Sequence, residues 1–279
     1  MRSTASMLSV LVAIVSLSFL NIAFAQNLSF ADWQRYNSAW HMDYIDKLLD
    51  ERLDPIVNPN GISGHLHQVI GGSRFGASYN GAEYKAASCT TCPIKADKSN
   101  YWMPKLFWIN NGGTSFTPVS GGQRFYYFLQ QSSPNEKVSA FPDGLRMLVG
   151  NPDSKVADNF RFSFTCQVNP PPYVGSIRSD NFNFERDCPN GMKVETHFPQ
   201  CWDGVNLYKS DGSHMSYPVG TSYRVGNCPW THPIRIPQVM TEFTYYTSSW
   251  APGQALKGNV AWANGDTTGY GVHADFVNG

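Results

Sequence analysis

The sequence predicts a mainly β protein, folded as a single β-sandwich or jelly-roll-like domain with long loops and an N-terminal helix. Short runs rich in Phe, Tyr and Val recur along the chain, and turn dipeptides separate them. This rhythm is typical of antiparallel strands joined by tight turns. The runs are residues 124–129, 145–149, 160–164 and 243–246. The turn dipeptides are Asn80-Gly81, Asn111-Gly112, Asp143-Gly144, Asn190-Gly191, Asp211-Gly212 and Asn264-Gly265.

Residues 1–25 are expected to be a signal peptide. Arg2 supplies a positive start, residues 7–20 form an apolar stretch, and Ala23-Phe24-Ala25 is a small-x-small cleavage pattern. The alternative, a membrane anchor, is disfavoured because the apolar run is short for a bilayer. The mature protein should be secreted, start at Gln26, leave the membrane after cleavage, and carry a glycosylation sequon at Asn27.

Residues 26–53 are expected to form a helical segment ahead of a β-rich domain at 54–279. Ser29 followed by Asp32 resembles a helix-capping box. Large apolar residues then recur every three or four positions and would make one face of a helix: Trp33, Tyr36, Trp40, Tyr44 and Leu48. The helix should end before Asp54-Pro55, because proline disfavours α geometry in the preceding residue.

Charge and composition restrict the partners. The chain has 21 basic and 21 acidic residues, so its formal net charge is zero. Nucleic acid and anionic membranes both require a basic surface, and neither is expected as a partner. The apolar fraction of 42% and the aromatic fraction of 14% exclude a disordered chain. We expect a folded monomer.

The cysteine count predicts disulfides. Six cysteines in a secreted protein indicate three bonds among Cys89, Cys92, Cys166, Cys188, Cys201 and Cys228. In a cytosolic protein, Cys89 and Cys92 would suggest a redox or zinc motif. The sequence offers no second CxxC and no short-spaced His pair after it, so a structural disulfide is favoured.

The segment His65-Leu66-His67 is the first candidate for chemistry. In a strand, residues two apart project to the same side, so the two imidazoles would lie together. Such a pair can chelate a metal, or one ring can act as acid or base while the other holds a substrate anion. The plain alternative is two histidines that are simply hydrogen-bonded in place.

A second candidate region spans residues 198–233, a long connection that cysteines would pin. It offers a carboxylate, two imidazoles, a phenol and two indoles: Asp203, His214, His232, Tyr217, Trp202 and Trp230. Long loops in compact domains usually hold function or disulfides. The alternative is a loop whose aromatic residues fill a secondary core. We expect His65, His67, His214 and His232 to converge in one concave site.

Many short motifs occur in the order seen in the DUF1996 family, which the chain resembles over roughly residues 50–279. They are Asp54-Pro55-Ile56-Val57, His65-Leu66-His67 with Gly71-Gly72, residues 99–104 and 141–147, Cys201-Trp202-Asp203-Gly204, Ser213-His214-Met215, Cys228-Pro229, His232-Pro233 and residues 269–276. The resemblance implies a secreted protein in a carbohydrate-related setting, often joined to modules such as WSC domains. It implies a site near the shared histidines but supplies no reaction. One departure is Pro59-Asn60-Gly61, where the family has Pro-Gly.

The sequence favours an enzyme that cleaves an extracellular or cell-wall polysaccharide without a required cofactor. Exposed aromatic rings stack on sugar faces, and the expected substrate-binding residues are Tyr101, Trp102, Arg146, Trp202 and Trp230. A His/Tyr pair could perform β-elimination on a uronic acid, with Arg146 neutralising its carboxylate. The expected catalytic residues are His65, His67, Asp203, His214, Tyr217 and His232.

Three alternatives stay open. A glycoside hydrolase would use two carboxylates among Asp203, Glu195 and Asp275; elimination is favoured because His and Tyr outnumber carboxylates near the motifs. A metal-dependent enzyme would build its site from His65 and His67 with one of His214, His232 or His273. A non-catalytic carbohydrate-binding or cell-wall protein would need only the aromatic residues.

Overall fold

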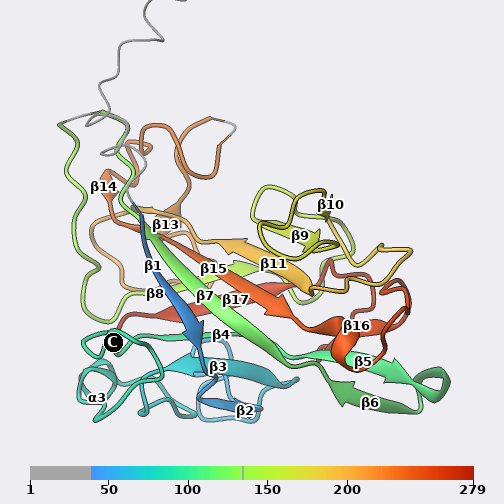
Figure 1. Cartoon of the computed structure of the whole chain (residues 1–279). Helices are drawn as coiled ribbons and strands as arrows, with labels where there is room; N and C mark the ends of the chain where they lie inside the picture. Colours follow the sequence, from blue (N-terminus) through green and yellow to red (C-terminus); the bar gives the residue numbers. More distant parts are fainter. Residues whose placement is uncertain (1–38, 134, 221) are drawn as a thin grey trace, which may run out of the picture.

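The computed structural model describes residues 39–133, 135–220 and 222–279, and two large antiparallel sheets dominate it (Figure 1). The six-stranded sheet has the order β1-β7-β15-β11-β9-β10, with bounds Ala39–Ile45, Gly121–Phe128, Gln238–Tyr245, Met192–His197, Phe162–Cys166 and Ile177–Ser179. The five-stranded sheet has the order β2-β3-β4-β17-β8, with bounds Leu49–Glu51, His67–Gly71, Asn100–Pro104, His273–Val277 and Arg146–Gly150.

Two three-stranded sheets and three short helices complete the described chain. One small sheet has the order β13-β12-β14, with bounds Met215–Ser216, Cys201–Trp202 and Ile234–Arg235. The other has the order β16-β5-β6, with bounds Val260–Trp262, Leu106–Asn110 and Ser115–Pro118. The helices are α3 (Gly81–Lys85) and the 3₁₀ turns η1 (Asn111–Gly113) and η2 (Thr247–Ser249). Over the described residues, none is long and apolar enough to cross a membrane.

The two large sheets pack face to face through alternate side chains. Tyr101 of β4 stacks on Phe125 of β7 across the interface, with ring centroids 4.2 Å apart. Phe276 of β17 and Phe243 of β15 continue the contact on either side. All four rings belong to one buried cluster. Successive residues of a strand point to opposite faces, and these four side chains are on the faces that the two sheets turn toward each other. The predicted β-sandwich is confirmed.

The outer face of the five-stranded sheet is covered as well. Val69, Trp102 and Val277 project from β3, β4 and β17 into a second apolar cluster. Ile56 and Tyr84, from the connections before β3 and after it, close over them. Every residue of β3, β4 and β17 is therefore buried. A polar side chain on this face is removed from water, which shifts its pKa from the usual value.

The predicted N-terminal helix is wrong over the residues that can be compared. Residues 39–45 form strand β1, which pairs with β7 and places Trp40 opposite Tyr127. Residues 49–51 form β2 on the edge of the other sheet. Long-range pairing buries Met42 and Ile45 and overrides the helical spacing. The predicted signal peptide and the remainder of the helix, residues 26–38, lie outside the described residues.

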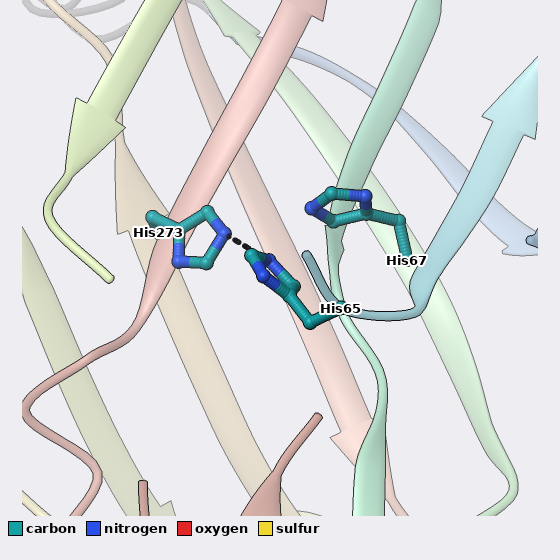
Figure 2. A group of neighbouring side chains, drawn as sticks. All are labelled: His65, His67 and His273. Atoms are coloured by element: carbon teal, nitrogen blue, oxygen red, sulfur yellow. Dashed lines mark hydrogen bonds between the residues drawn. The ribbon is translucent and has the colours of Figure 1, made fainter. Parts of the chain in front are cut away.

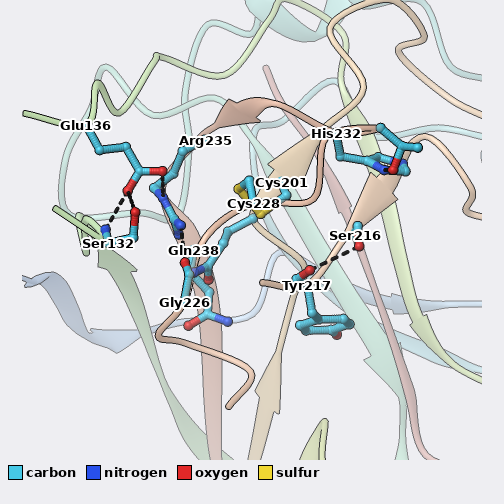
Figure 3. Close-up of a disulfide and its surroundings, with 12 residues drawn as sticks. Ser132, Glu136, Cys201, Ser216, Tyr217, Gly226, Cys228, His232, Arg235 and Gln238 are labelled. Carbon is cyan, nitrogen blue, oxygen red and sulfur yellow. Dashed lines mark hydrogen bonds and ion pairs between the residues drawn. A yellow bond between two sulfur atoms is a disulfide. The ribbon is translucent and has the colours of Figure 1, made fainter. Parts of the chain in front are cut away.

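Two of the three expected disulfides are present. Cys166 bonds to Cys188, and Cys201 bonds to Cys228. The second bond ties β12 to the loop ahead of β14, as Figure 3 shows. Cys89 and Cys92 are free, so the expectation that all six cysteines pair is corrected.

Candidate functional site

Three imidazoles meet on the outer face of the five-stranded sheet (Figure 2). His67 begins β3, His273 begins β17, and His65 lies two residues before His67. On β17, Ala274 and Phe276 face the sandwich core, so His273 must face outward with His67. The Nε2 atoms of His65 and His273 are 2.9 Å apart. One ligand atom from each of the three rings falls within 4.8 Å of the others.

Backbone carbonyls set the tautomers of the two buried rings. Nδ1 of His67 lies 2.9 Å from the Leu53 carbonyl, and Nδ1 of His273 lies 3.0 Å from the Gly271 carbonyl. A carbonyl only accepts, so each Nδ1 is the protonated, donating nitrogen. Each neutral ring then presents the lone pair of Nε2 to the cluster. Nε2 of His67 is buried and has no hydrogen-bond partner in the described part of the chain.

Burial keeps these rings neutral. Burial, and then the imidazoles of His65 and His273, lower the pKa of His67 to about 3. Burial lowers the pKa of His273 to about 4, although the hydrogen bond to the Gly271 carbonyl opposes the shift. The pKa of His65 is lowered by burial and then by the Arg52 guanidinium. A neutral imidazole with an orientated lone pair is the form that binds a metal ion.

Two carboxyl groups border the same cluster. Ligand atoms of Asp54, His67 and Asp275 also lie within 4.8 Å of one another. Oδ1 of Asp54 accepts the backbone N–H groups of Ile56 and Val57, which orients that side chain. Burial raises the pKa of Asp54. Burial, and then the nearby Asp54 carboxylate, raise the pKa of Asp275 far more.

Asp275 lacks a compensating group. Its residue is only 2% exposed, and the charged group that acts on its pKa is another carboxylate, Asp54. A carboxyl group buried in this way is very unfavourable in its ionised form. It must therefore stay protonated or bind a cation. A cation or a shared proton would therefore stabilise both the Asp275 carboxyl and the Nε2 atom of His67.

The set of donors can hold one metal ion. Three imidazole nitrogens and two carboxyl groups are available, a mixture that suits zinc, iron or manganese. His67 has a single free nitrogen because its Nδ1 is engaged by Leu53. The two ligand groups overlap at His67, so both lie around the same ring.

Sequence reasoning found part of this site. It singled out His65 and His67, and named His273 and Asp275 only as alternatives. It did not propose Asp54 as a site residue. A signal was present: His273 and Asp275 are two apart, as His65 and His67 are, so each pair would share a face if its segment were a strand. Only the pairing of β3 and β17 with β4 brings the two patterns together.

Of the four histidines that were expected to converge, only His65 and His67 lie in the cluster. His214 lies apart from the cluster: Nε2 donates to the Arg146 carbonyl at 2.7 Å, and Nδ1 accepts the Lys209 N–H at 3.2 Å. Both of its nitrogens are thus engaged by the backbone. His232 is on an exposed loop, where its Nε2 lies 2.9 Å from the Ser213 carbonyl (Figure 3).

Tyr217 and Asp203 have structural partners. The Tyr217 hydroxyl donates to the His197 carbonyl at 2.6 Å, and burial raises its pKa far above the usual value. Asp203 accepts from the backbone N–H groups of Val205 and Asn206 at 2.8 Å. Partial burial raises the Asp203 pKa, but these hydrogen bonds outweigh it and bring it to about 2. Each side chain holds its own loop in place.

The expected substrate-binding residues divide into buried and exposed ones. Tyr101 and Trp102 are each 1% exposed, so the expectation that they stack on a sugar is corrected. The Arg146 guanidinium lies over the rings of Tyr79 and Tyr208, and the half-buried Trp202 donates from its indole to the Asn206 carbonyl. Trp230 is 90% exposed and free to stack.

A cleft opens at the end of the sheet where His273 lies. It is lined mostly by polar residues of the connection after β8, together with residues next to His273: Gly150, Asn151, Ser154, Val156, Ala157, Asp158, Asn159, Arg161, Phe162, Tyr270 and Val272. Gly150 is the residue paired with His273 across the sheet. Asp153, in the same connection, is near enough to His65 to act on its pKa. The cleft and the imidazole cluster are therefore neighbours.

Comparison with known proteins gives a family. No curated protein and no solved structure matches the chain. The model of one family, described as a domain of unknown function (DUF1996), matches residues 54–279. The match begins at Asp54 and includes all five residues of the imidazole–carboxyl cluster. Because it covers most of the chain, this protein belongs to the DUF1996 family.

Proposed function

We propose that this protein is a secreted, metal-dependent enzyme that acts on extracellular polysaccharide and holds its ion with His65, His67 and His273. The observation that supports this most directly is the bare, buried Nε2 of His67. Ligand atoms of two further imidazoles, and of the Asp54 and Asp275 carboxyl groups, lie within 4.8 Å of a nitrogen of the same ring. A divalent cation would satisfy all of these groups at once.

The residues around the ion have distinct tasks. The Leu53 and Gly271 carbonyls hold the rings of His67 and His273 with Nε2 toward the ion. Asp275 can give up its proton to solvent when a cation arrives, and its charge then compensates that of the ion. A bound ion would supply Lewis acidity to polarise a substrate oxygen or a water molecule. His65 is the most accessible ligand and so marks the side from which substrate would approach.

Polysaccharide is the substrate class that the surroundings favour. The neighbouring cleft offers amide, hydroxyl, carboxylate and guanidinium groups with two aromatic rings, Phe162 and Tyr270, and this mixture suits a chain of sugar hydroxyls. The exposed indole of Trp230 offers a stacking surface elsewhere. Secretion is consistent with two disulfides and with the signal-like residues 1–25.

The first experiment measures the ion. The full chain is stripped with a chelator and titrated with Zn²⁺ or Mn²⁺ by calorimetry. We expect one ion per chain, with affinity reduced in His67→Ala by more than the ~10–100-fold typical of residues that merely support a ligand. His232→Ala is the matched control, because its half-buried ring contacts the Ser213 carbonyl and is not part of the cluster. Equal affinity in His67→Ala and the unmodified chain would refute the ion site.

The second experiment measures the reaction. The ion-loaded chain is incubated with a panel of plant and microbial polysaccharides, with and without chelator. We expect products that disappear with the chelator and in His67→Ala but persist in His232→Ala. Products that are unaffected by chelator would favour the metal-free acid–base reaction instead. Ion binding without product from any polysaccharide would refute the enzymatic part of the proposal.

A further inference from the structure

The two free cysteines, Cys89 and Cys92, do not belong to the imidazole cluster, and their exposure to solvent differs sharply. Cys89 is exposed, whereas Cys92 is 0% exposed and belongs to the sandwich core cluster. They are three residues apart on the segment between α3 and β4. One thiol is thus exposed to solvent, and the other, three residues later in the sequence, is buried.

Hydrogen bonds fix this segment against the end of β3. The Thr91 N–H donates to the Gly71 carbonyl, and the Gly71 N–H donates to the Thr91 hydroxyl. The Ser73 N–H donates to the Cys89 carbonyl at 3.0 Å, and the Cys89 N–H donates to the Ser73 hydroxyl at 3.4 Å. The Cys92 N–H donates to the Thr90 hydroxyl. The backbone that positions both sulfur atoms is therefore held at each end.

The surroundings separate the two thiols in acidity. The Ser73 hydroxyl and then the cationic Lys98 and Lys95 lower the pKa of the Cys89 thiol. Burial and the Asp97 carboxylate raise the pKa of Cys92 to about 12. The Lys95 ammonium donates to the carbonyls of Thr90 and Cys92, which holds it beside the two cysteines. This is the asymmetry of a pair in which one thiol attacks and the other resolves.

We propose that Cys89 and Cys92 form a thiol–disulfide exchange site that takes accessible disulfides as its substrate and works independently of the imidazole cluster. The exposure of the first sulfur and the burial of the second set the order of events. Both thiols are free in this structure, and Cys92, three residues away on the same hydrogen-bonded segment, is the thiol available to pair with Cys89 when it is oxidised.

The Cys89 thiolate attacks one sulfur of the substrate disulfide, that S–S bond breaks, and the released thiolate takes a proton from solvent. Cys92 then gives its proton to solvent and attacks the Cys89 sulfur, which releases the second substrate thiolate. Two electrons have passed to the substrate, which is now a dithiol, and Cys89–Cys92 is a disulfide. An external thiol such as reduced glutathione, itself oxidised to its disulfide, returns the pair to the starting state.

The test uses the full chain and oxidised glutathione as the probe. In Cys92→Ser, we expect glutathione to be trapped on Cys89 as a mixed disulfide, detected by peptide mass spectrometry. In Cys89→Ser, the buried Cys92 should take up none under the same conditions. In the unmodified chain, mixtures of reduced and oxidised glutathione should shift the 89–92 disulfide reversibly, while the 166–188 and 201–228 bonds stay intact.

A measurement without substitutions protects the test against misfolding. Iodoacetamide should alkylate Cys89 of the reduced, folded chain faster than it alkylates free cysteine below neutral pH, and should spare Cys92. A pair that stays oxidised in a millimolar excess of reduced glutathione would be a permanent structural bond and would overturn the proposal. So would alkylation of Cys89 no faster than that of free cysteine.

Discussion

The Nε2 atoms of His65 and His273 lie 2.9 Å apart although 208 positions separate the two residues. Two lone pairs cannot face each other at that distance without repulsion, so either His65 carries a proton there or both nitrogens face a common cation. Nδ1 of His273 already donates to the Gly271 carbonyl, which leaves its Nε2 as the lone pair in the neutral ring. This contact is the centre of the site.

Replacing Asp275 by Asn should leave the fold as stable as before, or more so, while weakening the binding of the ion. Without metal, we expect a Tm equal to or above that of the unmodified chain, because a neutral amide is easier to bury than an uncompensated carboxyl. Added Zn²⁺ should raise the Tm less than in the unmodified chain, where an ion at 100 times its Kd contributes about 2.7 kcal/mol. Calorimetric scans with and without the ion measure both.

The matched control for that substitution is Asp143→Asn, since Asp143 is an exposed carboxylate paired with Lys85. It should respond to Zn²⁺ as the unmodified chain does. The same ion-induced rise in Asp275→Asn as in this control would show that Asp275 does not hold the ion.

His197 should make the fold sensitive to acid. Burial lowers its pKa to about 3, with the nearby Glu195 carboxylate opposing the shift, against an unfolded value of 6.5. Between these values the unfolded chain takes up the proton and the folded chain does not, so stability is lost as the pH falls below 6.5. In His197→Gln, the slope of unfolding free energy against pH should be shallower by about 1.4 kcal/mol per pH unit.

Urea unfolding at several pH values inside that window measures the slope. Asn227→Gln is the control, because this exposed side chain does not titrate, and its slope should equal that of the unmodified chain. Identical slopes in His197→Gln and the unmodified chain would mean that the His197 ring titrates alike in both states.

Asp203→Ala should weaken the fold and spare the site. The side chain accepts two backbone N–H groups and the Asn206 amide, as a cap does, so its loss should cost about 1 kcal/mol of unfolding free energy. Zn²⁺ affinity should not change. Denaturation and calorimetry measure the two effects, and Asp180→Ala, at an exposed carboxylate, should change neither. Unaltered stability with lost product formation would instead place Asp203 in the reaction.

The strand content could be predicted from local pattern. Segments such as residues 124–129 and 160–164 carry the apolar residues of β7 and β9, and their side chains meet in the sandwich core. The N-terminal stretch could not be predicted in this way. The spacing of Trp40 and Leu48 suits a helix, but pairing of residues 39–45 with β7 is a contact over a long sequence distance.

The same distinction applies to the site. The residue types and the two-residue spacing around His65 and His67 pointed to chemistry from the sequence. The choice of His273 over His214 as their partner required the order β3-β4-β17, which places His67 and His273 on either side of one strand.

By itself, the sequence determined the class of fold, the family and two of the three rings of the imidazole cluster, since these follow from alternation, composition and short motifs. The tertiary structure decided which distant residues complete the cluster, which cysteines pair, and which aromatic rings are buried. The physical reason is burial. A side chain's partners and its pKa depend on what covers it, and here the covering segments come from parts of the chain that no local pattern connects.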